Sequence, residues 1–116
     1  MAGSDHRGVY WPITAYINAD FKKTIRIKRG GLPVNLTSDT FEAKVIGAQG
    51  DDTTIIKDLA PTAVLPYSSG TVEIDVDADD MDLTPGVYWW YWRWFDSDED
   101  DLNPLFYGPF TLELYP

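Results

Sequence analysis

The side chains that most often catalyse reactions are scarce in this sequence. It contains a single histidine, His6, and no cysteine, so a Cys–His pair is excluded. A Ser–His–Asp triad would have to use His6, and the sequence contains no G-x-S-x-G motif. Paired carboxylates act as acid and base only where a cleft perturbs their pKa values. We therefore expect no enzymatic activity, with a hydrolase that uses the aspartates of residues 75–82 as the alternative.

Acidic residues are abundant, and two segments of them have the donor groups of a metal site. The segment DSDEDD places Asp96, Asp98 and Asp100 at positions 1, 3 and 5 of an EF-hand calcium loop. Its sixth and twelfth positions hold aspartate and tyrosine in place of the glycine and glutamate of that motif. The second segment is the aspartate-rich stretch 75–82. We interpret the first segment as a solvated hairpin tip, keep its three aspartates as calcium candidates, and expect no cofactor.

The segment GVYWWYWRWF, residues 86–95, contains four of the five tryptophans. A β-strand directs alternate side chains to opposite faces. One row therefore consists of Tyr88, Trp90, Trp92 and Trp94, and the other of Val87, Trp89, Tyr91, Arg93 and Phe95. A small domain normally buries one face of a strand, so one aromatic row is expected to fill the core.

The second aromatic row has three interpretations. Trp, Tyr and Arg dominate the hot spots of protein interfaces, so Trp89, Tyr91 and Arg93 are predicted to contact another protein. Alternatively, the domain covers both rows with its own residues, or the exposed rings stack on carbohydrate. The segment VYW near the start of the chain is also apolar. We predict that Val9, Tyr10 and Trp11 either fold back on their own domain or lie on a neighbour, and we include them in the predicted interface.

The charge balance limits the possible partners. The net charge is −10, with 19 acidic and 9 basic residues, which argues against nucleic acid because phosphate binding requires Lys and Arg. Five basic residues fall within 22–29, and they indicate either a solvated strand face or a patch for an acidic partner. The sequence has no apolar run near 18 residues and no signal peptide, so we expect a soluble protein without membrane contact.

The elements that position these residues are short strands separated by turns. Alternating apolar residues predict strands at 13–17, 22–28, 41–47, 53–57 (an edge strand), 71–77, 87–95, 104–108 and 109–115. Residues 78–86 are expected to form a turn or a single helical turn. Seven or so strands without helical periodicity predict an all-β fold, an antiparallel Ig-like β-sandwich. We expect an N-terminal arm over residues 1–12 and one domain over 13–116.

Four segments carry a resemblance to a known group of proteins. They are VNLTSDTFEAKV after a Gly-Pro turn, GTVEIDVDADD, LTPGVYWWYWRWF and LFYGPFTLELYP. Together, from about residue 13 to 116, they resemble small Ig-like β-sandwich proteins of tailed bacteriophage virions, which have tail, baseplate or capsid-accessory roles. The segment NLTS at 35–38 departs from the DLTG-like residues of that pattern.

The resemblance implies a non-enzymatic virion structural protein, present in the host cytoplasm before assembly. Its partners would be other virion proteins and further copies of itself in a symmetric assembly. We expect a tail or baseplate component that docks through the second aromatic row and the N-terminal arm. The alternatives are a capsid decoration protein and a carbohydrate-binding module for recognition of the host surface.

Overall fold

The computed structural model describes residues 8–51, 53–96 and 101–114. Over these residues the chain is all-β, with two 3-10 turns, η1 (Tyr67–Ser69) and η2 (Ala78–Met81), and no α-helix. No helical turn within these ranges has the length or apolarity needed to cross a bilayer. The strands are β1 (Val9–Tyr10), β2 (Ile13–Tyr16), β3 (Phe21–Arg26), β4 (Lys28–Arg29), β5 (Leu32–Pro33), β6 (Thr40–Ile46), β7 (Ile55–Asp58), β8 (Thr62–Ala63), β9 (Thr71–Val76), β10 (Gly86–Asp96) and β11 (Asp101–Glu113).

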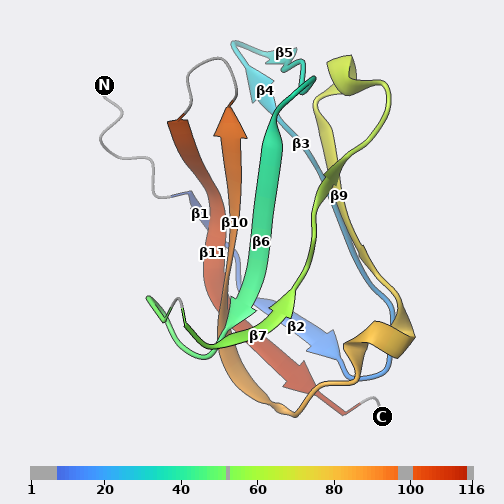
Figure 1. Cartoon of the computed structure of the whole chain (residues 1–116), viewed down its shortest axis with the longest axis vertical. Helices are drawn as coiled ribbons and strands as arrows, with labels where there is room; N and C mark the ends of the chain where they lie inside the picture. Colours follow the sequence, from blue (N-terminus) through green and yellow to red (C-terminus); the bar gives the residue numbers. More distant parts are fainter. Residues whose placement is uncertain (1–7, 52, 97–100, 115–116) are drawn as a thin grey trace.

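The larger sheet has the strand order β1-β11-β10-β6-β7. The strand β2 also pairs with β11, at residues 110–113, which follow the part of β11 that pairs with β1. Its centre is the long antiparallel pair β10–β11, with Gly86 opposite Leu112 at one end and Asp96 opposite Asp101 at the other. The register shifts at a bulge between Trp92 and Arg93. Figure 1 shows β11, β10 and β6 side by side along the long axis of the molecule.

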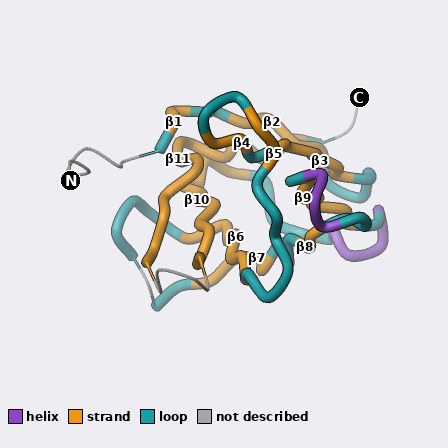
Figure 2. The backbone as a smooth tube through the Cα atoms, turned by 90° about the horizontal axis from the view of Figure 1, so that it is seen from above, coloured by secondary structure: helices purple, strands orange, loops and turns teal. Residues whose placement is uncertain are grey.

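A smaller sheet has the strand order β3-β9-β8, and β4 and β5 form a separate hairpin. Viewed along the long axis in Figure 2, β10 and β11 lie on one side and β3 and β9 on the other. The alternation of TVEIDV directs Val72, Ile74 and Val76 inward, and all three are buried. The prediction of a strand at 71–77 is therefore confirmed.

One hydrophobic core includes buried residues of both sheets. The row formed by Trp90, Trp92 and Trp94 supplies its largest side chains, and Trp90 and Trp92 are fully buried. They share the cluster with Val72 and Ile74 of the smaller sheet. The prediction that one aromatic row of residues 86–95 fills the core is therefore confirmed.

The expectation of purely antiparallel sheets was wrong, because β1 and β2 both run parallel to β11. Residues 104–108 and 109–115, predicted as two strands, belong to one strand that contains Pro109. The carbonyls of Tyr107 and Glu113 accept bonds from residues 11 and 17, so odd-numbered residues of β11 direct their backbone groups to this edge. Pro109 lacks an N–H, and it lies at the break between β1 and β2 where no donor is required.

Candidate functional site

The second aromatic row lies on the side of the larger sheet that faces away from the core. Trp89, Tyr91 and Arg93 are partly exposed there. The strand register continues the row across the sheet, because Tyr107 lies opposite Tyr91 and Tyr10 lies opposite Tyr107. These five residues, from β1, β10 and β11, are called the outer aromatic surface below. A prepositioned surface of Trp, Tyr and Arg has the composition of an interface hot spot.

Ring contacts run across the outer aromatic surface. The ring centroids of Tyr10 and Tyr107 are 5.6 Å apart with an angle of 69° between the planes. Those of Trp89 and Tyr107 are 6.1 Å apart with an angle of 36°. The Arg93 guanidinium carbon lies 3.9 Å from the centroid of the Tyr91 ring. Edge-to-face and cation–π contacts of this kind favour defined ring orientations, so we expect these rings to be ordered on the isolated domain.

A short ion-pair network borders the outer aromatic surface on the β6 side. Nη1 of Arg93 lies 3.4 Å from Oε1 of Glu42, and Nζ of Lys44 lies 3.6 Å from Oε2 of the same carboxylate. The three side chains are about one-third exposed, and ion pairs of this kind contribute less than about 1 kcal/mol to stability. Their main effect is to help hold the Arg93 guanidinium over the Tyr91 ring.

The apolar segment at the start of the described chain divides its side chains between two directions. Val9 and Tyr10 are 61% and 55% exposed. Trp11 instead packs against its own domain, with its ring 4.8 Å from Phe106 and 5.7 Å from Trp90. Its carbonyl accepts a 2.7 Å hydrogen bond from Nε1 of Trp90. Of the three residues predicted here for docking, Val9 and Tyr10 are therefore the ones that present their side chains to solvent.

Sequence reasoning missed Tyr107 as part of this surface. The residue lies in the segment LFYGPF, whose glycine and proline suggested an interruption between two strands. A single continuous strand restores the alternation and places Tyr107 between Tyr10 and Tyr91. The available signal was the period-two spacing of Tyr107, Pro109 and Thr111, which holds only if the proline is accepted inside the strand.

The two aspartate-rich segments that the sequence offered as metal sites have different outcomes. Asp98 and Asp100 lie outside the described residues, as does the side chain of Asp96. The stretch 75–82 is described, and the described part of the chain contains no group of three or more His, Cys, Asp or Glu arranged for a metal ion. In the loop after β6, hydrogen bonds from Thr53, and then from Thr54, hold the pKa of Asp51 below its ordinary value of 3.8. These hydrogen bonds join residues two and three positions apart, so they belong to a local turn.

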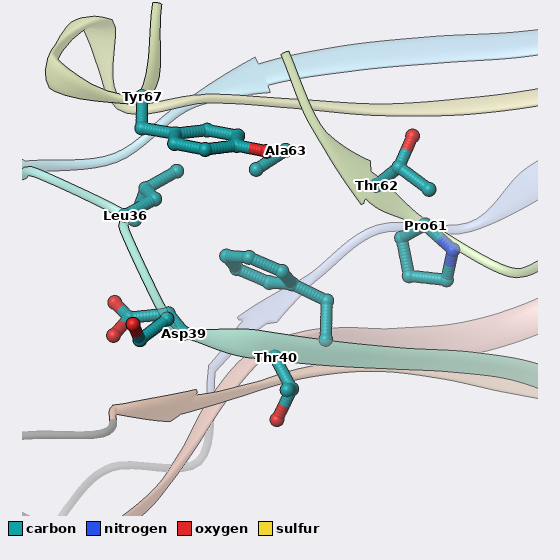
Figure 3. A pocket seen from close by; sticks show the side chains of 9 residues that line it. Leu36, Asp39, Thr40, Pro61, Thr62, Ala63 and Tyr67 are labelled. Atoms are coloured by element: carbon teal, nitrogen blue, oxygen red, sulfur yellow. The ribbon is translucent and has the colours of Figure 1, made fainter. Parts of the chain in front are cut away.

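A cleft of about 490 Å³ opens between the start of β6 and the segment 61–67. Its lining includes Leu36, Phe41, Ala63 and Tyr67 together with polar residues such as Ser38 and Thr62, and Figure 3 shows Tyr67 and Leu36 on the same side of the space. The Asp39 carboxylate at one end accepts a 2.9 Å hydrogen bond from Nε1 of Trp94. Since that carboxylate already accepts a hydrogen bond within the domain, we interpret the cleft as a recess of mixed polar and apolar lining and assign it no function.

The five basic residues of 22–29 do not form one patch. Lys22 lies 3.6 Å from Glu73, and Lys23 lies over the rings of Trp11 and Phe21. The Arg29 guanidinium carbon lies 5.3 Å from the ring centroid of Trp94. Most of these charges therefore have partners within the domain, which favours the interpretation of a solvated strand over that of a docking patch.

Comparisons with known proteins identify no family for this chain. No protein-family model and no curated protein matches the sequence. Among solved structures, a family 123 glycoside hydrolase from Clostridium perfringens is similar at 10% sequence identity and a TM-score of 0.41. The similarity covers 92% of this chain and 23% of that chain, so this chain spans about a quarter of the length of that enzyme.

Proposed function

We propose that this chain is a non-enzymatic structural protein that docks onto other protein subunits through the outer aromatic surface. One observation carries the proposal. The inner aromatic row is buried in the core, whereas Trp89, Tyr91 and Tyr107 form a second, ordered row that stays partly exposed. Contiguous exposed aromatic surface on a soluble domain usually marks a binding partner.

The physical argument concerns conformational entropy and desolvation. The rings are held by cross-strand contacts on a sheet, so a partner does not have to immobilise them, and less entropy is lost on binding. Tyr and Trp rings combine large apolar area with a polar atom, and a stacked Arg adds directional donors. A partner with an apolar pocket and a carboxylate or carbonyl rim would match this chemistry.

The setting that we propose is a tailed-phage particle, with the chain as a tail or baseplate component. Support comes from the resemblance of residues 13–116 to Ig-like virion proteins. We also propose the Ig-like sandwich as the finer description of the fold, supported by the shared core between the two sheets. The chain would reside in the host cytoplasm before assembly and in the virion afterwards, and capsid decoration is the alternative position.

Recognition of carbohydrate is the competing function for the same rings. Angles of 36° and 69° separate the ring planes of Tyr107 from those of Trp89 and Tyr10. The three rings therefore do not make one flat platform for an extended polysaccharide. A protein surface with relief accommodates tilted rings more readily, and this favours a protein partner.

The test is incorporation into particles. A tagged wild-type chain and a Trp89→Ala/Tyr91→Ala variant are expressed during infection, and purified particles are analysed by mass spectrometry. We expect the wild-type chain in particles and at least tenfold less of the variant, while a Tyr67→Ala control is retained. Absence of the wild-type chain, or equal retention of the variant, contradicts the proposal. Binding of the wild-type chain to a glycan array, lost in the variant, would establish carbohydrate recognition instead.

A further inference from the structure

The strands at the sheet edges differ in how they prevent pairing with another chain. Edge strands expose unpaired backbone groups, and proteins protect them with charged residues or proline. The β3 edge carries Lys22, Lys23 and Arg26, and the β7 edge carries Lys57 and Asp58. The remaining edge of the larger sheet is formed by β1 and β2.

The residues of the β1–β2 edge provide little such protection themselves, although Lys23 of β3 lies 5.6 Å from the ring centroid of Trp11. None of the residues 8–18, GVYWPITAYIN, is charged, although 24% of the whole chain is. Val9 and Tyr10 are among the most exposed large apolar residues of the described chain. Pro12 is the one protective residue in the segment. An uncharged edge rich in β-branched and aromatic residues is the type that accepts another strand.

The backbone of this edge has a donor that points outward. The amides of Trp11 and Ile17 donate to the carbonyls of Tyr107 and Glu113 in β11. Backbone groups of successive residues in a strand alternate in direction. The amide of Thr14 therefore points away from β11, toward the side of β2 where no described strand pairs.

We propose that the β1–β2 edge pairs antiparallel with the same edge of a second copy of this chain, around a two-fold axis. Such an isologous contact pairs residue i of one copy with residue j of the other and j with i, so each edge meets the same edge of its copy. Like charges directly opposite one another destabilise strand pairs. The basic β3 edge would place lysines against lysines, whereas residues 8–18 bring no charge together. This edge is therefore the one that matches itself.

The pairing would join the two larger sheets into one continuous sheet. Tyr10 lies at this edge and contacts Tyr107, so the two outer aromatic surfaces would lie side by side. The consequence for docking rests on the proposed function, because a two-fold pair of surfaces strengthens attachment to a repeating partner through multivalency. The pairing itself does not require that function.

The net charge of −10 predicts how the proposed dimerisation depends on salt. Two strongly acidic copies repel each other at long range, and salt screens this repulsion. Pairing through uncharged strands is therefore expected to strengthen as ionic strength rises. Docking through opposite charges would weaken under the same change.

The experiment is sedimentation equilibrium of the full chain over a concentration series at two salt concentrations. We expect a monomer–dimer equilibrium, stronger at high salt, and a dissociation constant at least tenfold higher for Thr14→Lys. The matched control is Thr24→Lys, which adds the same charge to the exposed face of β3 and is expected to dimerise like the wild type. Amide hydrogen exchange of the wild type adds a readout without mutation, because protection at Thr14 is expected to rise with protein concentration.

Three results would overturn the proposal: a wild type that stays monomeric at all concentrations, a Thr14→Lys variant that dimerises as tightly as the control, or protection at Thr14 that is independent of concentration. The Trp89→Ala/Tyr91→Ala variant separates this inference from the proposed function. If that variant dimerises but is lost from particles, the edge pairing and the docking through the outer aromatic surface are both supported. If the wild type enters particles without dimerising, the edge pairing alone is wrong.

Discussion

Two buried tryptophans of β10 provide a test of how the core is built. Nε1 of Trp90 donates a 2.7 Å hydrogen bond to the carbonyl of Trp11. Nε1 of Trp92 is buried and has no hydrogen-bond partner in the described part of the chain. Both side chains are fully buried. The substitutions Trp90→Phe and Trp92→Phe thus remove the same atoms from similar surroundings, but they differ in what happens to the hydrogen bond.

The difference between the two variants can be estimated without knowing the cavity term. The lost packing costs roughly 1–2 kcal/mol in each variant and cancels in the comparison. Trp90→Phe also deprives the Trp11 carbonyl of its donor, at a further cost of about 1–3 kcal/mol. Trp92→Phe removes a buried donor that has no acceptor, so it regains a similar amount of unfolding free energy. We expect Trp90→Phe to be less stable than Trp92→Phe by at least about 2 kcal/mol.

Urea unfolding followed by far-ultraviolet circular dichroism measures this difference, with each variant fitted to its own folded and unfolded baselines because the indoles also contribute to the signal. Equal m-values are required for the comparison. The midpoint temperatures should differ by roughly 8 °C in the same order. If Trp92→Phe is as destabilised as Trp90→Phe or more so, the indole nitrogens do not have the roles assigned to them, and the packing of the inner row would need revision.

Three further predictions concern the β1–β2 edge, the loop after β6 and the outer aromatic surface. In Gly108→Ala the new Cβ would lie 3.0 Å from the carbonyl oxygen of Trp11, so we expect loss of more than about 1 kcal/mol and faster proteolysis before residue 13. The lowered pKa of Asp51 stabilises the fold above the ordinary value of 3.8, and this contribution disappears as pH falls through the lowered pKa. The stability difference between the wild type and Asp51→Asn should therefore shrink in acid, as measured by urea unfolding at a series of pH values. Arg93→Lys loses the planar stack on Tyr91, so binding to particles should fall while the free energy of unfolding changes by less than about 1 kcal/mol.

Each of these predictions has a control or a contradicting result. Gly50 also has a positive φ, but nothing lies within 4 Å of a Cβ added there, so Gly50→Ala should leave proteolysis of the first residues unchanged. A constant stability difference for Asp51→Asn across the acid range would show that its carboxylate does not act through ionisation. Undiminished particle binding by Arg93→Lys would remove the arginine from the proposed interface.

The inner aromatic row could be predicted from the sequence because its signal is local. Period-two alternation and ring size together place Trp90, Trp92 and Trp94 on one face, and the structure buries all three. The same reasoning found strand 71–77 and the edge strand near 53–57, which the structure places as β7 at Ile55–Asp58. Local patterns are sufficient where one face of a strand is apolar.

The parallel pairing of β1 and β2 could not be predicted in the same way. It joins residues 9–16 to residues 106–113, almost a full chain length apart, and no local pattern encodes it. The direction of Trp11 depends on that pairing, because only its position beside Tyr107 brings its ring onto Trp90. The membership of Tyr107 in the outer aromatic surface depends on the long-range register of β11 in turn.

The proposed docking requires another protein to cover the outer aromatic surface in the assembled state. Hydroxyl-radical footprinting with mass spectrometry tests it most directly, by comparing oxidation of Trp89 and Tyr107 in the isolated chain and in purified particles. Oxidation of Val87, which is 71% exposed on the same strand, shows whether protection extends to the end of the surface. If docking covers this surface, Trp89 and Tyr107 are oxidised in the isolated chain and protected at least severalfold in particles. Equal oxidation of both residues in the two states would contradict it.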